Sequence, residues 1–105
     1  MHASLHDSSL LFTVAGDLLS TNVATVRADL LTALDRHTSA TSVVVNLSAA
    51  RTVDSQGLNL LISLLRECER RKLELRITEP QSQVHRLLSY LNLASRFGLP
   101  ALVAS

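Results

Sequence analysis

Apolar residues follow two different periods along this chain, and each change of period marks the edge of a predicted element. Residues 9–15 are rich in apolar and β-branched side chains and predict a β-strand, and residues 4–7 predict a short partner strand. Residues 43–47 predict a further strand, and its β-branched run at residues 43–45 is typical of a strand buried on both faces of a helix-covered sheet. Residues 73–78 alternate between apolar and polar side chains and predict a half-buried strand.

Helical spacing replaces this pattern between the strands. It predicts a first helix over residues 21–36, with Ser20 or Thr21 as its N-cap and an apolar side formed by Val23, Val26, Leu30 and Leu34. It also predicts a second helix over residues 57–71, whose apolar stripe is widened by Ile62 and otherwise consists of Leu58, Leu61, Leu65 and Cys68.

A third helix is expected to begin at Pro80, because a proline at the first helical position loses no hydrogen bond. Asn92 suits the left-handed position that ends a helix, and the buried side would carry Val84, Leu87, Leu88 and Leu91. The apolar tail predicts one more helical turn and an edge strand at residues 101–103. This alternation of strands and helices predicts a single α/β domain over residues 1–105.

The charge balance argues against several classes of partner. Charged residues make up 18% of the chain and the net charge is +1, which leaves no large field to hold nucleic acid or an anionic membrane. No apolar run reaches the roughly 20 residues that cross a bilayer, and the N-terminus lacks the pattern of a signal peptide. We therefore expect a soluble, cytoplasmic protein that does not insert into a membrane.

Residues that could hold a metal or form a disulfide are few and scattered. Cys68 is the single cysteine, so no disulfide can form within the chain, and its place on an apolar stripe predicts a buried rather than a reactive thiol. The four histidines have no metal-ligand spacing. We expect neither a metal site nor a cofactor.

Catalytic motifs are also missing from the sequence. The chain has three glycines and no glycine-rich phosphate loop. A nucleophile elbow around Ser55 would need a glycine where Val53 stands, although Gly57 supplies the second glycine of that motif. We therefore predict no catalytic residues and a protein that is not an enzyme.

One short segment, residues 53–58, stands at the predicted start of the second helix. The side chain of Asp54 or Ser55 can accept a hydrogen bond from the free N–H groups of the first helical turn, so the segment can be interpreted simply as an N-cap. A second interpretation makes Ser55 a phosphoacceptor, because the N–H groups and the dipole of a helix N-terminus favour a phosphate. From the residues alone, both interpretations stay open.

The order of these segments resembles the STAS domain, and in particular the bacterial anti-sigma-factor antagonists. The resemblance rests on the apolar strand and loop at residues 43–48, followed by Asp-Ser-x-Gly-Leu at residues 54–58. Gly16-Asp17-Leu18 stands where the family has Gly-Glu-Leu-Asp, and residues 77–80 and 91–93 resemble the family's closing segment. The resemblance implies an α/β STAS fold, with a mixed sheet of four or five strands and helices packed mainly on one face.

The resemblance also implies a partner switch. Antagonists of this type bind a serine-kinase anti-sigma factor and so release a sigma factor. The kinase phosphorylates the serine that follows the aspartate, which lowers the affinity, and a phosphatase restores it. By position this serine is Ser55, and the implied partner-binding residues are Asp54, Ser55, Gln56, Gly57, Leu18 and Leu19.

Two positions depart from the family pattern. Leu19 stands where the family often has an aspartate, and Gln56 replaces a second Ser or Thr, which leaves Ser55 as the only hydroxyl of the motif. Leu18 and Leu19 form an exposed apolar patch in one interpretation and pack under the first helix in the other. STAS domains also serve in lipid-transport and sensory complexes, so the alternative function is a subunit that docks the same helix face on a partner ATPase.

Overall fold

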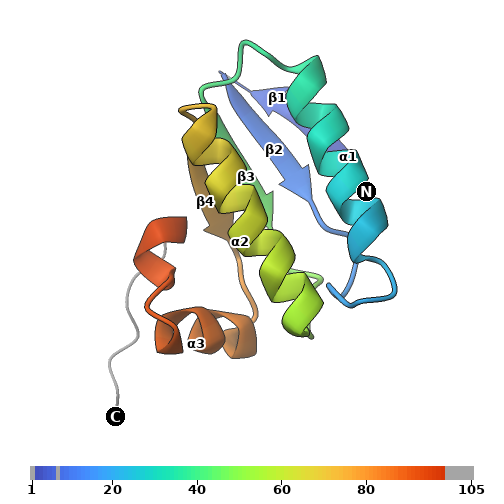
Figure 1. Cartoon of the computed structure of the whole chain (residues 1–105), viewed down its shortest axis with the longest axis vertical. Coiled ribbons are helices and arrows are strands. Elements are labelled where there is room, and N and C mark those ends of the chain that lie inside the picture. Colours follow the sequence, from blue (N-terminus) through green and yellow to red (C-terminus); the bar gives the residue numbers. More distant parts are fainter. Residues whose placement is uncertain (1, 7, 99–105) are drawn as a thin grey trace.

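The computed structural model describes residues 2–6 and 8–98, which form one sheet covered by helices (Figure 1). The strands are β1 (His2–His6), β2 (Ser9–Thr13), β3 (Ser42–Asn46) and β4 (Glu74–Thr78). The α-helices are α1 (Val23–Arg36), α2 (Ser55–Arg70) and α3 (Ser82–Tyr90), and a short 3-10 helix, η1 (Ala94–Phe97), follows them. The α/β class predicted from the alternation of patterns is confirmed.

Within the described residues the strand order is β1-β2-β3-β4. β1 pairs antiparallel with β2, and Ser8, which directly precedes β2, has a φ of 71°, whereas β2, β3 and β4 run parallel. Each parallel strand is joined to the next by one helix (Figure 1). Because parallel strands end at the same edge of a sheet, the loops that lead into α1, α2 and α3 all leave from one edge, where sites of such folds are built.

α1 and α2 lie side by side over one face of the sheet (Figure 1). The strand register aligns the buried side chains beneath them in two rows, Leu10 with Val43 and Leu75, and Phe12 with Val45 and Ile77. Val44, which points to the opposite face, is only half-buried. The prediction that residues 43–47 are buried on both faces is therefore wrong, because the β-branched run reflects strand propensity while only alternate side chains face the helices.

The apolar face of α2 is rotated relative to the predicted stripe. Leu58 and Ile62 are half-buried, and the buried residues are Gly57, Leu60, Leu61, Leu64, Leu65 and Cys68. The rotation arises because α2 packs against α1 as well as the sheet, and Leu60 and Leu64 lie on the side of α2 toward Leu30 and Leu31 of α1. Cys68 is fully buried, and burial raises the pKa of its thiol to about 11. The prediction that this cysteine acts as a small apolar core residue is confirmed.

α3 differs from its prediction at both ends. It begins at Ser82, after an N-cap at Gln81, so Pro80 precedes the helix instead of opening it. The predicted burial of Leu91 is wrong, since this side chain is 43% exposed in the turn that follows the helix. Asn92 has a φ of 60°, which confirms the predicted left-handed position at the helix end.

The remaining differences concern element boundaries. α1 begins at Val23 with Asn22 as its N-cap, rather than at residue 21 with Ser20 or Thr21. The partner strand, β1, lies earlier in the chain than the predicted residues 4–7. The predicted last helical turn is η1, whereas the predicted edge strand at residues 101–103 lies outside the described residues. In the part of the chain that is described, no helix is long and apolar enough to cross a membrane.

Replacing Leu65 by alanine is expected to lower the free energy of unfolding by about 2–5 kcal/mol, because it leaves a cavity beneath α2. Leu65 is 5% exposed and belongs to the main apolar core. Chemical denaturation of the purified variant measures the loss. Leu58→Ala, on the same helix but half-buried, is the matched control and is expected to cost less. An unchanged denaturation midpoint in Leu65→Ala would contradict this placement of α2.

Candidate functional site

Two loops meet at the carboxyl edge of the sheet and form the framework of the candidate site. Residues 14–22 join β2 to α1, and residues 47–54 join β3 to α2; together they are named the paired loops. Their backbones form an isolated parallel bridge between Leu18 and Val53. The N–H of Leu18 donates to the Thr52 carbonyl at 3.0 Å, and the N–H of Asp54 donates to the Leu18 carbonyl at 3.1 Å.

One carboxylate from each loop binds the backbone of the other loop. Asp17 Oδ1 accepts from the N–H groups of Arg51 at 2.9 Å and Thr52 at 3.1 Å. In the reverse direction, Asp54 Oδ2 accepts from the N–H of Ser20 at 2.8 Å. This exchange holds the two loops together at the point where α2 begins.

Asp54 is also the N-cap of α2. Its Oδ1 accepts from the N–H of Gly57 at 2.9 Å, which satisfies one of the free donors of the first helical turn. Hydrogen bonds from the N–H of Gly57 and then of Ser20 hold the pKa of the Asp54 carboxyl below its usual range. The sequence left Asp54 and Ser55 as alternative caps, and the structure assigns the cap to Asp54.

Ser55 is the first residue of α2, and its side chain is exposed at the edge of the domain. Gln56 beside it is exposed as well. The hydroxyl of Ser55 therefore lies where the N–H groups of a first helical turn and the helix dipole favour an anion. A phosphate on this oxygen would stand at the surface and would displace no core residue.

Gly57 is buried beneath the first of the paired loops, and only glycine fits at this position. A Cβ there would lie 2.3 Å from the carbonyl oxygen of Leu18 and 2.8 Å from the Leu18 Cβ. Leu18 is 0% exposed and belongs to the core, whereas Leu19 is half-buried. Of the expected partner-binding residues, Leu18 and Gly57 are buried in the described chain, whereas Asp54, Ser55, Gln56 and Leu19 retain access to the surface.

Sequence reasoning did not single out Asp17 or Asn22 as site residues. Asn22 Oδ1 accepts from the N–H of Leu19 at 2.9 Å, and Asn22 Nδ2 donates to the Asp17 carbonyl at 2.6 Å. A signal was available, since Asp and Asn side chains between a strand end and a helix start often bind nearby backbone groups. That signal predicts a structured turn, but it does not reveal that Asp17 binds the distant Arg51 and Thr52.

The loop that leads into α3 is tied to the same edge. Asn46 Nδ2 donates to Glu79 Oε2 at 2.8 Å, and Asn46 Oδ1 accepts from the N–H of Ser48 at 2.8 Å. Gln81 Nε2 donates to the carbonyl of Ser48. Ser55 thus stands at an edge where all three strand-to-helix loops are cross-linked by side-chain hydrogen bonds.

Gly57→Ala is expected to destabilise the fold by about 1–3 kcal/mol, because the added methyl group would collide with the Leu18 backbone and push the first of the paired loops away from α2. Gly16→Ala is the matched control, since a Cβ at Gly16 would meet no atom within 4 Å. Thermal and chemical denaturation of both variants measure the difference. Equal stability of the two variants would show that the contact between α2 and the first loop is looser than described.

Asp54→Asn is expected to destabilise the protein near neutral pH, because an amide NH2 would replace one of the two oxygens that accept from Gly57 and Ser20. A carboxyl whose pKa is lowered on folding stabilises the fold when the pH is above its pKa in the unfolded chain, here 3.8. This contribution is lost as the pH falls through the pKa of the folded state. The difference between parent and variant should therefore shrink below pH 3.8.

Urea denaturation at neutral pH and below pH 3.8 tests this expectation. Asp29→Asn, an exposed carboxylate in the middle of α1, is the control and is expected to change stability little at either pH. A loss of stability in Asp54→Asn that is the same at both pH values would contradict a role for the charge.

The fold and the sequence were compared with known proteins. The family model of the STAS domain matches residues 2–104. No curated protein sequence matches the chain. Among solved structures, a candidate anti-sigma factor antagonist of Thermotoga maritima is similar with a TM-score of 0.78 and 18% identity, over 88% of this chain and 78% of that one.

Two further proteins have similar structures. The Bacillus cell fate determinant SpoIIAA in its phosphorylated form gives a TM-score of 0.71 and 19% identity, over 90% of this chain and 85% of that one. The unphosphorylated form of SpoIIAA, an anti-sigma factor antagonist, gives a TM-score of 0.72 and 20% identity, over 88% of this chain and 80% of that one. A sulfate transporter family protein of Wolinella succinogenes gives a TM-score of 0.72 and 14% identity, over 90% of this chain and 75% of that one.

These identities are low, so the solved structures show a shared fold. The family match is of a different kind, because it spans nearly the whole chain, including β3, the paired loops and the start of α2. It agrees with the resemblance seen in the order of the sequence segments. This chain belongs to the STAS domain family.

Proposed function

We propose that this chain is an anti-sigma-factor antagonist whose binding is controlled by phosphorylation of Ser55. It binds a serine-kinase anti-sigma factor while Ser55 carries a free hydroxyl, and it thereby releases a sigma factor. The kinase phosphorylates Ser55, the complex dissociates, and a phosphatase restores the hydroxyl. The observation that carries the proposal is the exposed Ser55 side chain at the first position of α2, next to the Asp54 cap.

Phosphorylation at this position is compatible with an intact fold. Asp54 rather than Ser55 caps α2, so modification of the Ser55 hydroxyl does not remove the cap. The helix dipole favours the added charge of about −1.5 to −2. The modification would therefore change the surface that a partner meets while the core beneath α2 stays as it is.

The partner face proposed here consists of Ser55 and its accessible neighbours Asp54, Gln56 and Leu19. Leu18 and Gly57 support this face from inside, because their close contact sets the position of the first loop on α2. A phosphate on Ser55 would stand beside the Asp54 carboxylate. A partner fitted to a neutral hydroxyl would then meet two neighbouring negative groups, and like charges in an interface are costly.

The comparisons support this kind of control. SpoIIAA, an anti-sigma factor antagonist with a similar structure, has been solved in both unphosphorylated and phosphorylated forms. On this basis we propose a cytoplasmic binding protein that acts without catalytic residues or a cofactor and makes no direct contact with nucleic acid. Its partners would be the serine-kinase anti-sigma factor and the phosphatase.

A STAS subunit of a lipid-transport or sensory complex is the second candidate. The similarity to a sulfate transporter family protein favours this candidate, since that protein shares the fold and belongs to a family of transporters. In this role the face around Ser55 would dock on a partner ATPase. Affinity capture from the native cell followed by mass spectrometry separates the two candidates: an anti-sigma kinase supports the antagonist, and a transport ATPase supports the subunit.

Ser55→Asp and Ser55→Glu are expected to fold like the parent and to bind the kinase partner at least about tenfold more weakly. An unfavourable charge in an interface can cost several kcal/mol, and each ~1.4 kcal/mol corresponds to a tenfold change in affinity. Ser55→Ala is expected to bind and to resist phosphorylation. Titration calorimetry with the cognate kinase measures the affinities, and circular dichroism checks the fold.

Ser82→Asp is the matched control, because Ser82 is an exposed serine at the first position of a different helix, α3. This variant should bind like the parent. Incubation with the kinase and ATP, followed by mapping of the phosphate, is the decisive experiment. A phosphate on Ser48 or Ser63 with Ser55 unmodified would overturn the proposal.

A further inference from the structure

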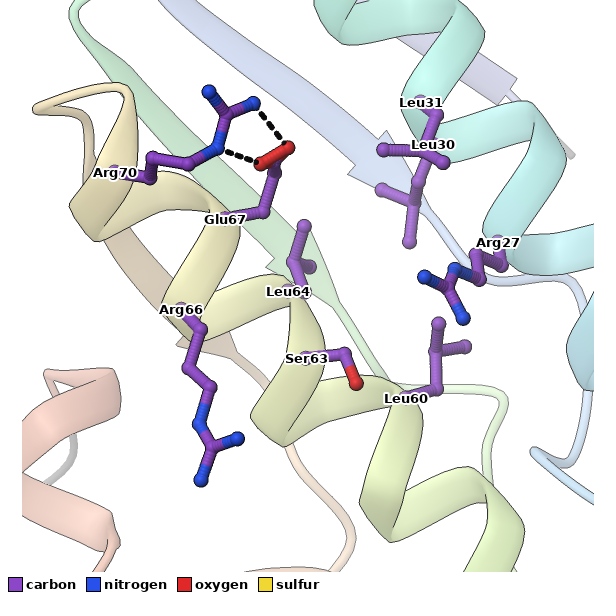
Figure 2. A pocket seen from close by; sticks show the side chains of 9 residues that line it. All are labelled: Arg27, Leu30, Leu31, Leu60, Ser63, Leu64, Arg66, Glu67 and Arg70. Atoms are coloured by element: carbon purple, nitrogen blue, oxygen red, sulfur yellow. Dashed lines mark hydrogen bonds and ion pairs between the residues drawn. The ribbon is translucent and has the colours of Figure 1, made fainter.

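A groove between α1 and α2 takes no part in the proposed switch. It has a volume of about 300 Å³, and residues from both helices line it (Figure 2). Its floor is apolar and consists of Leu30, Leu31, Leu60 and Leu64. A hollow between helices with an apolar floor and a few polar groups at its rim is typical of a small-molecule site, and this volume lies at the lower end of the range for such sites.

The charged residues around this floor give the groove a net positive charge. Arg27 from α1 and Arg66 and Arg70 from α2 line the groove, together with the acid Glu67. The Glu67 carboxylate accepts from Arg70 Nε at 2.8 Å and from Arg70 Nη2 at 2.6 Å, so an arginine already neutralises it. The arginines that remain favour an anionic ligand.

Arg27 is the cation best placed to bind such a ligand. Figure 2 shows its guanidinium reaching from α1 toward α2, close to Leu60, whereas Arg66 points away from the leucines. Arg27 is exposed, and among residues 8–98 no carboxylate forms an ion pair with it. A planar guanidinium can bind a carboxylate through two parallel hydrogen bonds.

We propose that this groove binds a small anionic amphiphile, a molecule with one carboxylate on a short apolar body. The carboxylate pairs with Arg27, and the apolar body covers the leucines of the floor. A partner helix is about 10 Å across and would rest on the rim of a hollow of this size instead of entering it. The inference is independent of the antagonist role, because no residue of the groove belongs to the paired loops.

Titration of the isotope-labelled full chain with octanoate, below its critical micelle concentration, tests the proposal. The amide signals of Leu31, Ser63 and Leu64 are expected to shift and saturate, while that of Ser55 stays in place. Octanol and octyltrimethylammonium share the apolar chain but lack the anionic head. Both are expected to bind at least about threefold more weakly, since an exposed ion pair contributes modestly to affinity.

Arg27→Gln is expected to weaken octanoate binding about three- to fivefold. Arg36→Gln is the matched control, because Arg36 is also exposed on α1 but lies outside the groove. Ser63→Phe changes an exposed lining residue and should fill the groove and abolish the shifts. This variant leaves the core leucines untouched, so it also tests the site if Arg27→Gln folds poorly.

Four results would overturn the proposal: no saturable shift in the parent, octanol binding as tightly as octanoate, unchanged affinity in Arg27→Gln, or unchanged shifts in Ser63→Phe. Sedimentation over a range of protein concentrations tests whether a second copy of the chain occupies the groove instead. A dimer that perturbs the same amide signals without octanoate would show that a second copy of the chain fills the groove, and it would overturn the proposal as well.

Discussion

The close contact between Gly57 and the backbone of Leu18 is the constraint on which the geometry of the candidate site depends. Because Gly57 has no Cβ, the first of the paired loops can lie directly on the start of α2. In this position the Leu18 carbonyl accepts from the N–H of Asp54, and the N–H of Ser20 reaches the Asp54 carboxylate. Two residues of the motif, Asp54 and Gly57, thus fix the geometry, and Ser55 between them stays exposed.

The fold was predictable where buried side chains repeat with a clear period. The alternation in β4 and the helical spacing in α1 give such patterns, and both elements are present, although α1 begins two residues later than predicted. In α2 the periodicity does not identify the buried face, because its many leucines fit several apolar stripes equally well. Only its contact with α1 decides that Leu60 and Leu64 are buried while Leu58 is half-buried. That contact is tertiary and leaves no local signal.

The candidate site was predictable in part for the same reason. The chemistry of a helix N-terminus is local, so the sequence could place Asp54 and Ser55 at the start of α2. The exchange of hydrogen bonds between the paired loops joins residues far apart in the chain, as Asp17 and Thr52 show. Neighbouring leucines in a loop have no period either, so no pattern could reveal that Leu18 is buried and Leu19 half-buried.

The burial of Cys68 has a consequence for how this domain responds to its surroundings. The thiolate is the form of cysteine that reacts with peroxides and exchanges with disulfides. With a pKa raised to about 11 and no exposed surface, this thiol stays protonated and out of reach at neutral pH. Cys68 is the single cysteine of the chain, so oxidants find no reactive thiol in the native protein. In the antagonist role proposed above, control through Ser55 would therefore not depend on the redox state of a thiol in this domain.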